Sequence, residues 1–119
     1  MEDNWKKIRA EGLALYNAKG VNLFKDEAEN LKDTGDWKQL DLFFRGRKQA
    51  NCNKAPITCS IIGAFAPAAT CTRGQAKFSV MLPNTHVWPH CGPTNCRLRS
   101  HLGLVVPKNT YLRVAEDTR

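Results

Sequence analysis

The chain has 119 residues, of which 42% are hydrophobic and 24% charged, and these proportions are typical of one globular domain. No stretch of about 20 apolar residues occurs, which excludes a membrane-spanning helix within this sequence. The polar and acidic start, Met1–Asn4, is not followed by an apolar segment and therefore predicts no signal peptide.

The net charge of +7 is unevenly distributed along the chain, because no Asp or Glu occurs between Leu42 and Ala115. Such a stretch is either an ordinary solvated basic surface or a pocket or groove for an anion. The anion would be a small carboxylate, an acidic peptide or nucleic acid. Charge alone does not choose among these.

The first predicted element is an amphipathic helix over Asn4–Lys19, with Asn4 as its N-cap and Gly20 as its C-terminal stop. Gly12 weakens this prediction. The apolar residues that recur at roughly helical spacing are Trp5, Ile8, Leu15 and Tyr16. Residues 20–36 are charged and rich in turn formers, which predicts a loop with at most one helical turn.

The segment Trp37–Phe44 alternates and predicts a strand, which ends at the basic turn Arg45–Lys48. Its apolar face is predicted to carry Leu40, Leu42 and Phe44. A short helix is predicted over Pro56–Phe65.

Five cysteines stand at positions 52, 59, 71, 91 and 96, and an odd number excludes complete pairing within the chain. Cys52 and Cys59 enclose a short loop that a disulfide would close in an oxidising compartment, whereas free thiols are the alternative. No Cys-x-x-Cys occurs, which disfavours zinc-ribbon and thioredoxin-type sites.

The second half of the chain is predicted to be mainly strands. Lys77–Leu82 alternates, a Pro- and Gly-rich connection follows over Pro83–Pro93, and Arg97–Val106 alternates again. Tyr111–Ala115 begins a third predicted strand. Strands separated by turns and preceded by helices predict an antiparallel β core with helices packed at its edge.

Alternation over Arg97–Val106 places Arg97, Arg99 and His101 on one face of the predicted strand. Arginine presents a planar set of donors that matches a carboxylate, and Ser79 on the neighbouring strand adds a hydroxyl. These residues are either a cradle for a small carboxylate or the solvated side of a sheet.

The three histidines are the metal-ligand candidates, and His90 lies in a turn-rich loop where a ligand can point into a pocket. A non-haem iron site usually carries His-x-Asp, but the residue two positions after His90 is Gly92. From the pattern alone, His90 is therefore either a metal ligand or a structural histidine.

A longer pattern covers most of this second half. It extends from Phe78 to Pro107 and includes HVWPH at His86–His90, GPTN at Gly92–Asn95, and RLRSHLGL at Arg97–Leu104. This run resembles the core motif of the aspartyl/asparaginyl β-hydroxylases. The likeness continues back through the Cys52 and Cys59 segments, Arg45–Arg47 and Gly35–Trp37 to Asn4–Lys6.

The resemblance implies a mainly β fold with an N-terminal helix and a partial double-stranded β-helix core of the jelly-roll or cupin-like kind. Residues 1–119 would form a single domain, incomplete at its C-terminal side. Within it, residues 1–50 are a helical and extended region, residues 51–74 hold the cysteine loop and short helix, and residues 75–119 form the β core.

Site residues follow from the same resemblance. His90 matches the first iron-ligating histidine, in a family that holds iron with two histidines and no protein carboxylate. Arg99 and His101 match residues at the C1 carboxylate of 2-oxoglutarate, and Ser79 matches a residue at its C5 carboxylate. His86 matches no ligand and is expected to be structural.

Two further expectations concern the cysteines. The resemblance pairs Cys52 with Cys59 in a disulfide, which agrees with work in the lumen of the endoplasmic reticulum. Cys91 stands beside His90 where the family pattern leads us to expect a small polar residue such as Thr.

The implied activity is an oxygenase that uses Fe(II), 2-oxoglutarate and O₂ to hydroxylate the β-carbon of Asp or Asn in EGF-like domains. No nucleic-acid partner is expected. The second iron-ligating histidine and an arginine for the distal carboxylate are expected beyond Arg119, so we expect this chain alone to bind iron weakly and to hydroxylate little.

Two alternatives remain at this stage. One is a catalytically silent interaction domain of the same fold. The other is a basic zinc-binding module for nucleic acid, with Cys91, Cys96 and His90 or His101 as ligands and Arg45–Lys48 for phosphates.

Overall fold

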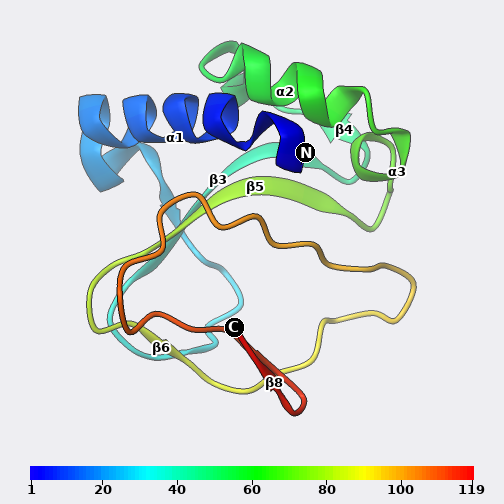
Figure 1. Cartoon of the computed structure of the whole chain (residues 1–119). Coiled ribbons are helices and arrows are strands. Elements are labelled where there is room, and N and C mark those ends of the chain that lie inside the picture. Colours follow the sequence, from blue (N-terminus) through cyan, green and yellow to red (C-terminus); the bar gives the residue numbers. More distant parts are fainter.

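Helices cover one face of a small antiparallel sheet in the computed structural model, which describes all 119 residues (Figure 1). The central strand is β3, Trp37–Phe44, whose bounds are those that the sequence predicts. One edge of β3 pairs with β5, Gln75–Met81, and the other pairs with the two-residue strands β1, Lys25–Asp26, and β4, Arg47–Lys48.

The predicted N-terminal helix is confirmed as α1, Trp5–Lys19, which lies between the 3-10 turns Glu2–Asn4 and Gly20–Leu23. Gly12 belongs inside this helix for a reason that propensity does not capture. A Cβ built on it would meet the ring of Phe78 on β5 at 3.1 Å. Glycine therefore lets α1 lie close to the sheet.

The second helical segment includes both cysteines of the predicted loop. A 3-10 turn at Ala50–Asn53 leads into α2, Pro56–Gly63, and then into the single turn α3, Ala66–Ala69. The predicted helix over Pro56–Phe65 is therefore confirmed with its end two residues earlier. Pro56 is well suited to the start of α2. The N–H groups of the first helical turn have no acceptor within the helix, so a proline, which has no N–H, costs no hydrogen bond there.

The apolar face of β3 differs from the predicted alternation. A β-bulge between Asp41 and Phe43 inserts Leu42 as an extra residue, so that Phe43 pairs with Ala76 and is buried. Phe44 then pairs with Gln75 and is 36% exposed, against the prediction that it joins Leu40 and Leu42 in the core. Strict alternation fails because one strand of the pair carries the additional residue.

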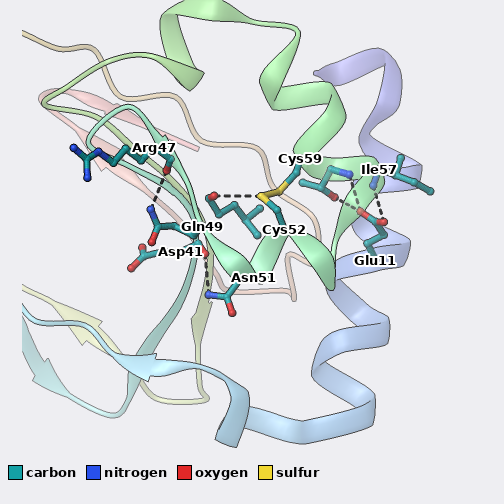
Figure 2. Close-up of a disulfide and its surroundings, with 10 residues drawn as sticks. Glu11, Asp41, Arg47, Gln49, Asn51, Cys52, Ile57 and Cys59 are labelled. Atoms are coloured by element: carbon teal, nitrogen blue, oxygen red, sulfur yellow. Dashed lines mark hydrogen bonds between the residues drawn. A yellow bond between two sulfur atoms is a disulfide. The ribbon is translucent and has the colours of Figure 1, made fainter.

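The core lies between the sheet and the helices. Its ten buried apolar residues are Ile8, Phe24, Leu40, Leu42, Phe43, Cys52, Ala55, Cys59, Ile62 and Phe78. Two links hold α2 to the rest of the molecule, and both are drawn in Figure 2. One is the Cys52–Cys59 disulfide, and the other is the side chain of Glu11 on α1.

The carboxylate of Glu11 caps the N-terminus of α2. It accepts hydrogen bonds from the backbone N–H groups of Ile57 and Thr58, at 2.9 and 2.7 Å, and from the Thr58 hydroxyl at 2.6 Å. A carboxylate is favourable there because it satisfies helix N–H groups that have no acceptor within the helix and because it complements the positive end of the helix dipole. The cap comes from a distant segment, so no local capping motif predicts it.

The rest of the chain has little regular structure. Two short ladders pair β2, Lys32–Thr34, with β6, His86–Val87, and β7, Arg113–Val114, with β8, Asp117–Thr118. The third predicted strand, Tyr111–Ala115, is thus reduced to β7. None of the helices combines the length and the apolar composition that crossing a bilayer requires.

The strand predicted over Arg97–Val106 is wrong for this structure, because the segment pairs with no other strand. Alternation supplies a suitable pattern but no hydrogen-bond partner for the backbone, and a strand needs both. Side chains meet part of this need, since Arg9 Nε on α1 donates to the Leu104 carbonyl at 2.9 Å. Leu102 and Leu104 pack against the core from an extended coil. The double-stranded β-helix stays a prediction.

Candidate functional site

The face of the sheet turned away from α1 and α2 is polar. Since Phe78 points into the core, its neighbours Lys77 and Ser79 on β5 point to the opposite, open face. The register places Ser79 opposite Gln39 and Lys77 opposite Asp41 on β3. One of the expected site residues, Ser79, therefore lies on this open face.

The hydroxyl of Ser79 has a defined partner. Trp37 Nε1 on β3 donates a hydrogen bond to Ser79 Oγ at 2.7 Å. Because the oxygen accepts this bond, the hydroxyl hydrogen stays available for donation to an anion. No sequence pattern points to Trp37 as a site residue, because its contact with Ser79 depends on the register between β3 and β5.

Next to Ser79, the open face carries a paired charge. Lys77 Nζ lies 2.8 Å from Glu27 Oε2 and also donates to the Gln39 side-chain oxygen. Both charged side chains are largely buried, at 15% and 6% exposure, so each needs its partner. The neighbouring Asp41 has one buried carboxylate oxygen, Oδ1, that accepts no hydrogen bond. The charge of Lys77 is therefore neutralised by Glu27.

His90 is exposed and held by one local hydrogen bond. Its Nδ1 lies 2.7 Å from the Trp88 carbonyl oxygen, and a carbonyl only accepts, so Nδ1 carries the hydrogen. In the neutral ring this leaves the lone pair on Nε2, which is the arrangement that metal-ligating histidines use. The backbone N–H of Trp88 donates to the Leu31 carbonyl oxygen at 2.9 Å and holds the segment that leads to His90.

The other loop histidine, His86, has the contacts of a structural residue, as the sequence analysis expects. Its Nδ1 lies 3.1 Å from Asp33 Oδ2, and its ring packs edge-on against Trp88 at 5.4 Å between centroids. The contact with Asp33 connects β6 to β2.

The expected carboxylate cradle is only partly assembled. One nitrogen of the Arg97 guanidinium donates to the Arg73 carbonyl, which holds this side chain beside the turn before β5. Arg99 and His101 are exposed. Partial desolvation and then the positive charge of Arg99 lower the pKa of His101 below its ordinary value, so the two side chains act on each other.

No hydrogen bond or ion pair joins His90 to Ser79, Arg99 or His101. A surface hollow of about 300 Å³ lies between α1 and α2, and none of these four residues lines it. No three His, Cys, Asp or Glu side chains come together as a metal site. His90 therefore belongs to no metal centre that the residues of this chain form among themselves.

The cysteines separate into two kinds. Cys52 and Cys59 form the expected disulfide, with their Cα atoms 5.6 Å apart. Cys71 is half-buried, and Cys91 and Cys96 are exposed and free. Cys96 Sγ lies 2.8 Å from Thr94 Oγ1, and neither exposed cysteine joins a histidine in a metal-binding group. The zinc-module alternative has no ligand cluster in this structure.

Known proteins similar to this chain identify its family. The first two relatives match over the whole chain, and both are named aspartyl/asparaginyl beta-hydroxylase. A family model described as aspartyl/asparaginyl beta-hydroxylase matches residues 2–119. The chain belongs to the aspartyl/asparaginyl β-hydroxylase family.

Individual relatives agree with the family model. The chain is 53% identical to aspartyl/asparaginyl beta-hydroxylase of Mus musculus and 52% identical to that of Homo sapiens, in each case over 100% of this chain. It is 35% identical, over 98% of its length, to aspartate beta-hydroxylase domain-containing protein 2 of Rattus norvegicus. The chain spans 16% of the length of the first two relatives and 35% of the third.

Proposed function

We propose that this chain is part of the catalytic domain of a 2-oxoglutarate- and Fe(II)-dependent oxygenase that hydroxylates the β-carbon of Asp or Asn in EGF-like domains. The observation that carries the proposal is the match to β-hydroxylases along the whole chain. We further propose that the protein acts in the lumen of the endoplasmic reticulum, where an oxidising environment would keep the Cys52–Cys59 disulfide formed.

Iron does not fit the residues of this chain taken alone, since His90 is a single ligand without a second His or a carboxylate beside it. We propose that the remaining ligand comes from a part of the longer family protein that this chain does not include. Bound there with 2-oxoglutarate and O₂, the iron would supply the oxidising chemistry. The chain's own contribution is to bind and orient.

Three side chains have the chemistry to bind the dicarboxylate. Arg99 offers a planar guanidinium that matches a carboxylate in two hydrogen bonds. His101 offers a ring N–H beside it, and the free hydrogen of the Ser79 hydroxyl suits the other carboxylate. For all three to act on one ligand, the coil that carries Arg99 and His101 has to close over the open face of the sheet.

Cosubstrate binding can be tested on the chain as it is. Calorimetric titration with 2-oxoglutarate is expected to show weak binding that Arg99→Ala reduces at least about tenfold, because a charge-assisted pair is lost. Arg113→Ala, which removes an exposed arginine of the terminal hairpin, is the matched control and is expected to change nothing. Equal losses in the two variants would remove Arg99 from the proposed site.

Iron binding and hydroxylation form the second test. Anaerobic titration with Fe(II) and 2-oxoglutarate is expected to give weak binding for this chain, and an EGF-like domain incubated with it in air is expected to gain little or no oxygen by mass spectrometry. Tight, stoichiometric iron binding would overturn the inference that His90 needs a ligand from elsewhere. A longer protein that includes this chain and still fails to add oxygen to Asp or Asn would overturn the proposed activity.

A further inference from the structure

Five basic residues lie on the segments that meet where the β3–β4 turn contacts the turn that precedes β5. The backbone N–H of Arg45 donates to the Gly74 carbonyl at 2.9 Å, and Arg97 donates to the carbonyl of Arg73 next to it. Three segments that are far apart in the sequence therefore meet here. We call the five side chains the basic turn cluster: Arg45, Arg47, Lys48, Arg73 and Arg97.

No acidic side chain neutralises this cluster. The four salt bridges of the structure use Lys32, Lys38, Lys77 and His86, and none uses a member of the cluster. The stretch from Leu42 to Ala115 holds no Asp or Glu that could serve. Four of the five cations are exposed, and only Arg97 is half-buried. Like charges on neighbouring segments repel one another, and a bound anion lowers that repulsion.

The backbone of the β3–β4 turn is strained at Arg45, which has a positive φ. Arg45 has φ +51° and Gly46 has φ +74°, and Phe44 pairs with Arg47, so the two form a tight hairpin turn with both central residues left-handed. Asn, Asp and Gly adopt this conformation readily, whereas a long side chain such as Arg does so at a cost. Glycine is required at position 46 for two reasons. Its φ is positive, and a Cβ there would lie 2.8 Å from the Thr70 carbonyl oxygen.

The strained arginine is also fixed in direction. Its guanidinium carbon lies 5.2 Å from the centre of the Phe44 ring, and this ring is on the open face because of the bulge in β3. A side chain held by a cation–π contact loses less freedom when it binds a ligand than a free lysine does. Strain retained at an exposed charged residue points to a role in binding.

We propose that the basic turn cluster binds an acidic stretch of a partner polypeptide, independently of hydroxylation. Arginine guanidinium groups match carboxylates in paired hydrogen bonds. The adjoining strand β4 pairs with β3 alone, so its second edge has no strand partner, and an extended peptide can pair with such an edge.

Other anionic partners fit less well. Single-stranded nucleic acid needs open aromatic faces for base stacking, and the Phe44 ring in this cluster lies under the guanidinium of Arg45. A membrane surface is usually met by a basic amphipathic helix, whereas these cations come from turns and a two-residue strand.

A glutamate-rich peptide with a fluorescent label, titrated with the whole chain and followed by anisotropy, tests the proposal. We expect binding that weakens as salt is raised, because exposed charges are screened. The variant R45N/R47Q/K48Q is expected to weaken binding roughly tenfold or more, given three lost exposed pairs. Asn at position 45 suits the left-handed conformation, so the turn is expected to persist, and thermal melting checks this.

The matched control is K6Q/K19Q/K108Q, which removes the same charge at three exposed lysines that form no salt bridge. We expect it to weaken binding less than about twofold, as a change in net charge alone would. Equal weakening in both variants would overturn the proposal, as would no binding at low salt. Tighter binding of a single-stranded oligonucleotide or of phosphatidylserine vesicles would also overturn it. The Arg99 titration above is unaffected by any of these outcomes.

Discussion

The chain up to Phe78 and the chain after it differ in what they bury. All eleven buried residues lie between Ile8 and Phe78, and none follows. Beyond that point many large apolar side chains are exposed, namely Met81, Trp88, Leu98, Val105, Val106, Tyr111, Leu112 and Val114. We call the first region the packed layer and the second the outer coil.

The division at Phe78 separates the buried core from the residues of the proposed site, all of which follow it. Ser79 begins the outer coil and still lies on a paired strand, whereas His90, Arg99 and His101 lie farther along it in segments without strand pairing. A segment with few buried contacts opens at low free-energy cost, so its side chains change position easily when a ligand binds. The packed layer is expected to determine stability, and the outer coil is expected to respond to ligand.

The largest expected effect compares one leucine from each region. Leu42, at 1% exposure, lies in the bulge and fills the core, so Leu42→Ala is expected to lower the free energy of unfolding by about 3 to 4 kcal/mol. Leu98 is 100% exposed, and Leu98→Ala is expected to change it by less than about 0.5 kcal/mol. Urea unfolding measures both. Similar losses in the two variants would show that the outer coil is packed in solution.

Removing the disulfide is expected to have the next largest effect. Cys52 and Cys59 close a short loop seven residues apart in the packed layer, so replacing both with Ala is expected to cost about 2 to 3 kcal/mol. Cys91→Ala, at an exposed free thiol of the outer coil, is the control and is expected to cost almost nothing. A wild-type chain whose stability is unchanged by a thiol reductant would contradict this prediction.

The Glu11 cap ranks third. Glu11→Gln keeps the size of the side chain but removes the charge that three donors of α2 share, and we expect a loss of about 1 to 2 kcal/mol. Glu2→Gln, at an exposed carboxylate in the first 3-10 turn, is the comparison and is expected to be near neutral. Thermal melting of the two variants at neutral pH separates these outcomes.

The smallest expected effect is a pH dependence on the outer coil. The pKa of His101 is lowered in the folded chain, so the unfolded chain binds more protons between that lowered pKa and the ordinary value of 6.5. Stability is therefore expected to rise with pH through this window and to level off above it. His101→Gln is expected to flatten this rise. A His101 ring that titrates at or above 6.5 by NMR would reverse the sign.

Sequence patterns predict the packed layer well because the periodicity there reflects burial. The bounds of β3 and the start of α2 follow from local signals, and α1 is correct despite Gly12. Local signals fail at Phe43 and Phe44, since a bulge is a property of two paired strands. They fail again over Arg97–Val106, where an alternating segment has no strand beside it.

The candidate site was predictable only as far as motifs reach. The run from Phe78 to Pro107 identifies the family, which the comparisons confirm, and resemblance rather than geometry selects His90, Arg99 and His101. Contacts between distant segments were not predictable, because pairing register decides them. Trp37 meets Ser79 in this way, and Glu11 meets Thr58.

The extra residue at Leu42 has a consequence for how this sequence can change in length. Before it, even-numbered residues of β3 face the helices, and after it odd-numbered residues do. A single deletion there would restore strict alternation only by shifting the basic turn one step along β5, away from the Gly74 carbonyl that receives the Arg45 N–H. Gaps among relatives should therefore collect in the loops on either side of β3 and spare the strand itself.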